Sequence, residues 1–219
     1  MDKQFRDACE RGHLPVVQEL LALQGDRVIN VHTGDEIAFQ RACGNGHLDV
    51  VQELLALTGD RAVNVHARNE YAFRWACASG HLPVVQELLA LRGDRAVNVH
   101  ANDELAFRWA CASGHLPVVQ ELLALGGDRV IGVHADDENA FQLTFENGHL
   151  DVVRELLALE GAQAPNPAVV KELGLEGLYH TVRWDRRRAM LVRRTAAVRA
   201  KCTARAEKPA VSSPPECKL

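Results

Sequence analysis

Histidine and cysteine, side chains that often ligate zinc, recur in this chain at a fixed interval of 34 residues. They form three columns: His13, His47, His81, His115 and His149; His32, His66, His100 and His134; and Cys9, Cys43, Cys77 and Cys111. Zinc needs its ligands about 2.0–2.3 Å from one ion, whereas members of one column are expected roughly 10 Å apart. No Cys-x-x-Cys or His-x-x-x-His spacing occurs. We therefore expect the histidines to support turns and stacking by hydrogen bonds, and we expect neither a metal site nor a cofactor.

Catalytic motifs are absent from the sequence. It contains no Gly-x-Ser-x-Gly, no phosphate-binding Gly-Lys-Ser/Thr loop and no dinucleotide-binding glycine pattern. Serine occurs only at Ser79, Ser113, Ser212 and Ser213. No nucleophile or base in a cleft can be nominated, so the sequence predicts a protein that is not an enzyme.

The same interval runs through the whole framework of the chain. The phrase Gly-His-Leu-x-Val-Val occurs five times, starting at Gly12, Gly46, Gly80, Gly114 and Gly148, and a phenylalanine recurs at Phe5, Phe39, Phe73, Phe107 and Phe141. A unit of this length cannot bury its apolar face alone, so copies must stack on one another. Aromatic residues make up only 5% of the chain, so the core is expected to consist mainly of Leu, Val and Ala.

Each unit has the pattern of two short helices. Asn69, like Asp35, Asp103 and Asp137 in the sister units, is predicted to cap the first helix. Phe73 and Cys77 share one apolar face of that helix, and Gly80 is expected to end it. The second helix then carries an apolar stripe and is expected to stop at Gly93. Residues 94–103 are interpreted as an extended connector or hairpin-like finger.

This arrangement, a short helix, a tight turn, a helix with Gly-His-Leu-x-Val-Val-x-x-Leu-Leu and a connector, resembles the ankyrin repeat family over residues 1–161. The usual Thr-Pro-Leu-His of that family is replaced by Tyr71-Ala72-Phe73-Arg74 and its counterparts, and the period is one residue longer than usual. The tetratricopeptide alternative lacks that family's spaced Trp, Gly, Tyr and Pro positions. The resemblance implies an all-α solenoid with almost no sheet. Its five units are expected at about 1–38, 39–72, 73–106, 107–140 and 141–174.

Positions that vary between units are the candidates for binding a partner, because the shared scaffold does not fix them. On each first helix, the side that points away from the Phe and Cys face carries a stripe of apolar, aromatic and polar residues. Further varying positions lie at the tips of the connectors. The predicted protein-binding residues are Ile37, Arg41, Arg68, Tyr71, Trp75, Asn102, Leu105, Trp109, Asp136, Asn139 and Leu143. Trp, Tyr and Arg carry much of the binding energy at interfaces. The alternative is that Trp75 and Trp109 pack between neighbouring first helices, and both interpretations stay open.

Charge is divided unevenly along the chain. Residues 1–182 carry 14 Lys and Arg against 26 Asp and Glu, whereas residues 183–208 carry 10 against 2. Residues 175–207 are predicted to form a basic helix with Trp184, Leu191 and Val198 in a narrow apolar seam, and residues 208–219 to be disordered. Its basic patch comprises Arg183, Arg186, Arg187, Arg188, Arg193 and Arg194. The favoured interpretation is a cap that docks Trp184 and Leu191 on the fifth unit. The alternatives are a nuclear-import or nucleic-acid patch, an anionic-membrane contact, or a calmodulin-like partner site.

In the proteins that this chain resembles, the first helices and finger tips line a concave binding surface. The resemblance therefore implies a non-catalytic scaffold that binds another protein through its concave face. The alternative is a nucleic-acid-associated or nuclear protein that acts through the basic helix, with nucleic acid or an anionic surface as its partner. The chain shows no secretion signal at its N-terminus and no apolar run of about 20 residues. We expect a monomer in the cytoplasm or nucleus, not secreted, with buried, reduced column cysteines.

Overall fold

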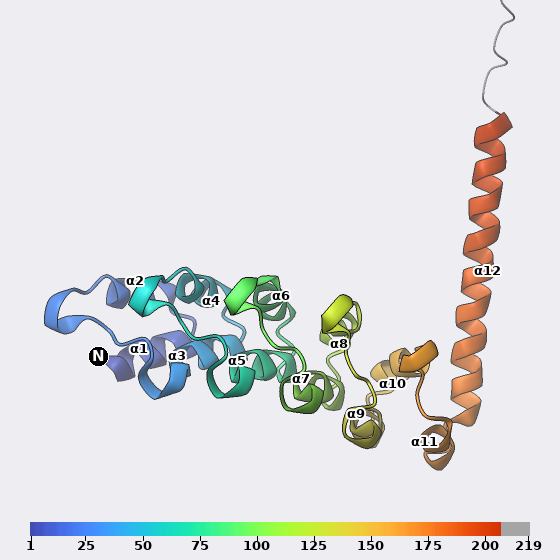
Figure 1. Ribbon diagram of the computed structural model, residues 1–219, viewed down its shortest axis with the longest axis horizontal. Helices are drawn as coiled ribbons and strands as arrows, with labels where there is room; N and C mark the ends of the chain where they lie inside the picture. The colour runs from blue at the N-terminus through green and yellow to red at the C-terminus, as the bar shows by residue number, and fades with distance from the viewer. Residues whose placement is uncertain (207–219) are drawn as a thin grey trace, which may run out of the picture.

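The computed structural model describes the backbone of residues 1–206 and their side chains, apart from Asp26, Asp137, Arg194, Thr195 and residues 197–206. The predicted disordered segment 208–219 lies outside the described residues. The described chain is all helical and contains no strand, which confirms the predicted fold class. Short helices form two rows, and a long helix stands at one end (Figure 1).

The two rows correspond to the two helices of each unit. The first helices are α1 Asp2–Glu10, α3 Thr33–Gly44, α5 Ala67–Ala78, α7 Ala101–Ala112 and α9 Ala135–Glu146. The second helices are α2 Leu14–Leu21, α4 Leu48–Leu55, α6 Leu82–Ala90, α8 Leu116–Leu123 and α10 Leu150–Leu157. Consecutive first helices contact each other far more extensively than consecutive second helices do. The first helices therefore lie closer together and form the inner side of the stack.

Short 3-10 turns follow each second helix: η1 Gly25–Arg27, η2 Gly59–Arg61, η3 Gly93–Arg95, η4 Gly127–Arg129 and η5 Gly161–Gln163. The predicted stop at Gly93 is therefore wrong, because α6 ends at Ala90 and Gly93 opens η3 with a φ of 60°. Extended residues then lead to the next unit, and residues 1–206 contain no hairpin. The connector is thus a 3-10 turn followed by an extended segment.

The turn between the two helices of a unit depends on glycine. At Gly80, φ is 75°, and the neighbouring His81 N–H donates to the Ala76 carbonyl at 3.0 Å, as in a Schellman motif. A Cβ at Gly80 would lie 2.4 Å from Nδ1 of His115 in the next unit. The corresponding Gly148, with φ 78°, has nothing within 4 Å of such a Cβ. The glycine thus serves both the turn and the close packing of the next histidine.

The start of each first helix differs from the prediction. Asn69 does not cap α5, because Arg68, Asn69 and Glu70 adopt a left-handed conformation with φ of 54°, 55° and 61°. The same left-handed turn contains Asp35 and Asp103, whereas the side chain of Asp137 lies outside the described residues. Regular right-handed helix begins only at Tyr71.

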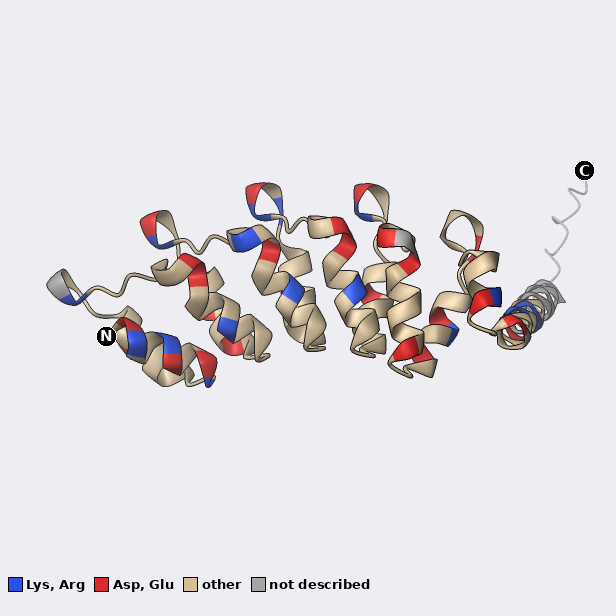
Figure 2. Cartoon of the chain, turned by 90° about the horizontal axis from the view of Figure 1, so that it is seen from below, with Lys and Arg blue, Asp and Glu red and all other residues tan. Residues whose placement is uncertain are grey.

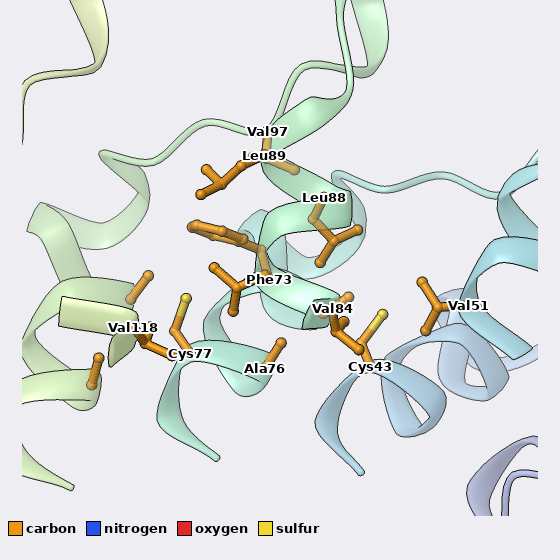
Figure 3. Close-up of a cluster of buried hydrophobic side chains, with 14 of the residues drawn as sticks. Cys43, Val51, Phe73, Ala76, Cys77, Val84, Leu88, Leu89, Val97 and Val118 are labelled. Carbon is orange, nitrogen blue, oxygen red and sulfur yellow. The ribbon is translucent and has the colours of Figure 1, made fainter. Parts of the chain in front are cut away.

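A continuous apolar core runs through the stack. Figure 3 shows Phe73, Cys77 and Leu88 of one unit between Val51 of the preceding unit and Val118 of the following one. In the three central units, the recurring phenylalanine of the first helix and one leucine of the second helix are at most 1% exposed: Phe39, Phe73, Phe107, Leu54, Leu88 and Leu122. The shared apolar face of each first helix is therefore confirmed.

The column cysteines are buried and not bonded to one another. Burial raises the pKa of the Cys9 thiol to about 12 and also raises the pKa of Cys43, Cys77 and Cys111. Because the thiolate is the reactive form, we expect these four thiols to label with a thiol reagent only as fast as the stack opens. Labelling should become rapid in denaturant. Rapid labelling of all cysteines in native protein, counted by mass spectrometry, would contradict the assigned face.

Polar side chains also link one unit to the next along the second helices. Four glutamines donate to a glutamate 35 residues further on, as Gln18 to Glu53, Gln52 to Glu87, Gln86 to Glu121 and Gln120 to Glu155, at 2.8–3.0 Å. Each link has the same sequence separation, so the same contact recurs at every unit boundary.

The stack ends at α11 Pro167–Glu172 and α12 Glu176–Ala206. Leu178, Tyr179 and Val182 at the start of α12 pack against the core, and α12 contacts α10 and α11. The predicted docking of Trp184 and Leu191 is wrong, since these side chains are 69% and 61% exposed. The physical reason is that α12 continues away from the stack (Figure 1). The seam residue Val198 lies outside the described side chains.

Candidate functional site

The predicted binding residues on the inner row lie on four consecutive first helices. The apolar and aromatic members are all half-buried: Ile37 on α3, Tyr71 and Trp75 on α5, Leu105 and Trp109 on α7, and Leu143 on α9. Partial exposure leaves some of each side chain open to solvent. The row therefore presents a stripe of apolar surface that crosses the unit boundaries.

The centre of this stripe is a cluster of aromatic rings around one arginine. The ring centroids of Tyr71 and Trp75 lie 5.7 Å apart with the planes tilted by 60°. The guanidinium carbon of Arg74 lies 5.5 Å from the Tyr71 ring and 5.6 Å from the Trp109 ring of the next unit. Arg74 thus joins α5 to α7 through cation–π contacts, each worth about 0.5–2 kcal/mol depending on exposure.

Arg74 was not predicted as a site residue, and its second role explains why it is buried. Its Nε and Nη2 donate to the carbonyls of Asn69 and Arg68, both at 2.8 Å. These carbonyls belong to the left-handed turn, so the arginine satisfies backbone groups that the turn leaves without a helical partner. Desolvation lowers the pKa of Arg74, partly offset by Tyr71 and Glu70. In the preceding unit Gln40 has the same role and donates to the Asp35 carbonyl.

The tryptophans also pack against the preceding units. A Cβ at Gly44 of α3 would lie 2.3 Å from the Trp75 ring, so this ring rests directly on the α3 backbone. Trp109 meets Arg74 of the preceding unit. Each half-buried indole therefore contacts a neighbouring unit with one side and faces solvent with the other.

Each polar member of the predicted site pairs with a residue of an adjacent first helix. Arg41 pairs with Glu10, Arg68 with Asp35 at 3.2 Å, and Arg108 with Asp136 and, at 3.3 Å, with Asn139; Asn69 donates to Asn102 at 3.4 Å. In Figure 2 the blue Lys and Arg residues of the stack lie singly among red Asp and Glu residues. Such exposed pairs contribute little stability. The charged rim is consequently close to locally neutral, and the apolar stripe is its distinctive feature.

A ladder of histidine–glutamate pairs holds the connector segments in register. Nδ1 of His66 faces the Glu70 carboxylate at 2.6 Å, and Nε2 faces the Asp94 carbonyl of the next unit at 2.7 Å. Glu70 also accepts from the Asn98 N–H at 3.2 Å. The same pairs recur as His32–Glu36, His100–Glu104 and His134–Glu138. The expected hydrogen-bonding role of this histidine column is confirmed.

The protonation of these histidines follows from the two acceptors. Neither a carboxylate nor a carbonyl can donate, so the arrangement favours a hydrogen on both ring nitrogens. The pKa of His32 and of His66 is raised by the glutamate hydrogen bond and then by the carbonyl. For His100 the Asp128 carbonyl has the larger effect on the pKa, followed by Glu104. Burial lowers the pKa of His134, but its carbonyl and Glu138 hydrogen bonds give a net rise.

The second histidine column supports the turns between helices. Nε2 of His47 and of His115 bonds the carbonyls of Glu10 and Ala78 in the preceding units, at 2.9 and 3.0 Å. Burial lowers the pKa of His81, partly offset by a hydrogen bond to the Gly44 carbonyl. A neutral ring with Nε2 protonated is sufficient for these bonds.

The basic residues of α12 divide into docked and exposed members. Arg183 is half-buried, bonds the Tyr179 hydroxyl and lies over its ring, and Arg186 donates to the Ala158 carbonyl of the stack. The exposed members are Arg187, Arg188 and Arg193, and the side chain of Arg194 lies outside the described residues. The patch is therefore partly structural.

Neither a metal-binding cluster nor a membrane span is found in the described part of the chain. No three His, Cys, Asp or Glu side chains described in the structure gather closely enough to hold a metal ion. Among residues 1–206, no helix combines the length and the apolar character that crossing a bilayer requires.

Comparison with known proteins identifies the repeat. A family model described as ankyrin repeats (3 copies) matches residues 5–103 and again residues 73–168, which together span most of the chain. No curated protein matches the sequence.

Proposed function

The chain belongs to the ankyrin repeat family, and we propose that it is a scaffold or adaptor that binds a partner protein through the inner row of first helices. Ankyrin repeats are generally protein–protein interaction modules, and proteins of this family are typically non-enzymatic. The observation that carries this proposal is the cluster of the half-buried Tyr71, Trp75 and Trp109 around the buried Arg74, which joins α5 to α7.

Physical chemistry supports this choice of surface. Aromatic and arginine side chains dominate binding energy, especially where neighbouring contacts already restrict their motion. Trp75 and Trp109 are held on one side by the adjacent unit, so little side-chain entropy remains to be lost on binding. The flanking Ile37, Leu105 and Leu143 extend the apolar surface along the row. Arg41, Arg68, Asn102, Asp136 and Asn139 form a polar rim that can exchange its present partners for those of a bound protein.

Alanine substitution of the tryptophans tests the proposal. A partner is first captured from a lysate of the source cells with wild-type chain and then purified. We expect Trp75→Ala and Trp109→Ala each to weaken its binding by about 2 kcal/mol, roughly thirtyfold, as measured by calorimetric titration. Gln86→Ala, on the second-helix row, is the matched control and should bind as wild type.

Thermal melting of the same variants separates binding from packing. The proposal requires that the tryptophan variants remain folded at the titration temperature. If affinity is unchanged while the melting temperature falls sharply, the rings act only as filler between units and the proposed surface is wrong.

A further inference from the structure

The exposed side of α12 is a feature that the proposed function leaves unused. Leu178 and Val182 attach the start of the helix to the stack, but Trp184, Met190 and Leu191 are 69%, 51% and 61% exposed. Trp184 follows Val182 by two residues, about 200° around the helix, so it lies opposite the attachment. Leu191, seven residues later, lies on nearly the same side. The attached face and the exposed apolar seam are therefore on opposite sides of one helix.

Arginines lie on both flanks of this seam. Arg187 is about 60° to one side of Trp184 and Arg188 about 40° to the other. Both side chains are exposed. From residue 183 to 193 the helix carries five arginines and one acidic residue, Asp185. The surface that covers the seam must therefore be anionic and must also accept an indole and a leucine.

This pattern distinguishes between classes of partner. A protein groove that binds a helix takes apolar anchors at i, i+3, i+4 and i+7. Relative to Trp184, the i+3 and i+4 positions are Arg187 and Arg188, so such a groove would have to bury two guanidinium groups. Duplex nucleic acid would pair its phosphates with the arginines but would leave Trp184 and Leu191 in water. A single strand could stack one base on Trp184 but would still leave Leu191 exposed. A bilayer surface accommodates both, since Trp favours the headgroup level and arginine reaches phosphates beside a buried apolar face.

We propose that α12 binds the surface of a bilayer containing anionic phospholipid, with Trp184 and Leu191 in the headgroup region and Arg187 and Arg188 on the lipid phosphates. The helix lies along the surface and does not cross the bilayer. Residues 1–182 carry an excess of acidic residues, so the same lipids repel the stack. Because α12 leaves the end of the stack (Figure 1), the inner row of first helices stays accessible while the chain is attached.

The test uses the full chain and vesicles of phosphatidylcholine with or without phosphatidylserine, in a co-sedimentation assay. We expect binding only to vesicles that contain phosphatidylserine, weakened by added salt. Trp184→Ala should lower the affinity about tenfold. Met190→Ala is the matched apolar control, about 120° away around the helix, and should bind as wild type.

The charge is tested by a second matched pair. Arg187→Gln should lower vesicle affinity roughly fivefold, and Arg193→Gln, on the side opposite Trp184, should have a smaller effect. Both side chains are exposed, so melting should be unchanged. The proposal is overturned if phosphatidylserine vesicles do not bind, or if Trp184→Ala and Met190→Ala weaken binding equally. Binding of RNA or of an acidic protein that is tighter than vesicle binding would also overturn it, whether or not Trp184→Ala weakens that binding.

Discussion

Gly80→Ala is expected to lower the free energy of unfolding by about 4 kcal/mol. An alanine in the left-handed conformation costs about 1–2 kcal/mol, and forcing a methyl group into a packed site costs about 1–3 kcal/mol. The new Cβ would lie 2.4 Å from Nδ1 of His115, so the ring must move, with loss of its bond to the Ala78 carbonyl. Urea denaturation followed by circular dichroism measures the change.

Gly148→Ala is the matched control for this prediction. Gly148 has the same left-handed turn, with φ 78°, but no atom within 4 Å of an added Cβ. It should therefore show only the conformational cost of about 1–2 kcal/mol. Adding His115→Ala to Gly80→Ala should relieve some of the larger loss. Equal losses for the two glycine variants would show that the contact with His115 is not what restricts Gly80.

His66→Ala is expected to lower the free energy of unfolding by about 2–3 kcal/mol, and by more at low pH than at high pH. The carboxylate of Glu70, 4% exposed, would keep the Asn98 N–H but lose its bond to the ring. Leaving a buried acceptor without its partner costs about 1–3 kcal/mol. Loss of the bond to the Asp94 carbonyl adds to this.

The pH dependence follows from the raised pKa of His66. The folded chain holds this proton more tightly than the unfolded chain, whose histidine pKa is about 6.5. The stabilisation that comes from protonated His66 is therefore complete below the unfolded pKa and disappears as pH rises through the folded pKa. The difference in the free energy of unfolding between wild type and His66→Ala, from urea titrations at several pH values, should therefore shrink as pH rises. His81, whose pKa is lowered, is present in both proteins, so its opposite contribution cancels.

The exposed His13 in the first unit provides the control. His13→Ala should change stability by much less than His66→Ala at every pH. A wild-type minus His66→Ala difference that grows as pH rises would contradict the assigned protonation state.

The period and the apolar faces were sufficient to predict the helices and the core. Phe73 and Leu88 have counterparts in every unit, each with further apolar residues three or four positions away on the same side of a helix, and both residues are buried. The left-handed turn at Arg68–Glu70 was missed because Asn and Asp favour both helix caps and left-handed residues. Local sequence cannot separate these two uses. The deciding bonds, from Glu70 to His66 and Asn98, span up to 28 residues.

The candidate site was only partly predicted. Tyr71, Trp75 and Trp109 are brought together as one stripe, whereas Arg74 at the centre was overlooked because it adjoins the buried Phe73. The sequence signal for Arg74 was the position after the recurring phenylalanine, which is polar in all five units: Arg6, Gln40, Arg74, Arg108 and Gln142. For α12, the spacing of Trp184 and Leu191 predicted an apolar seam but not what covers it. The spacing of residues shows that they share one side of a helix, but it does not show which molecule contacts that side.

The glutamine–glutamate links on the second helices have a consequence for the size of the protein. Each joins residues 35 apart, and the histidine links of the connectors join residues 28 apart, in every copy. These links are the same at each boundary, so gain or loss of one whole unit would leave them intact at the remaining boundaries, whereas first-helix contacts such as Arg74 with Trp109 differ between boundaries. The length of the inner face can thus change in steps of one unit, which gives evolution a way to adjust the reach of a binding surface while the links of the second helices and connectors are kept.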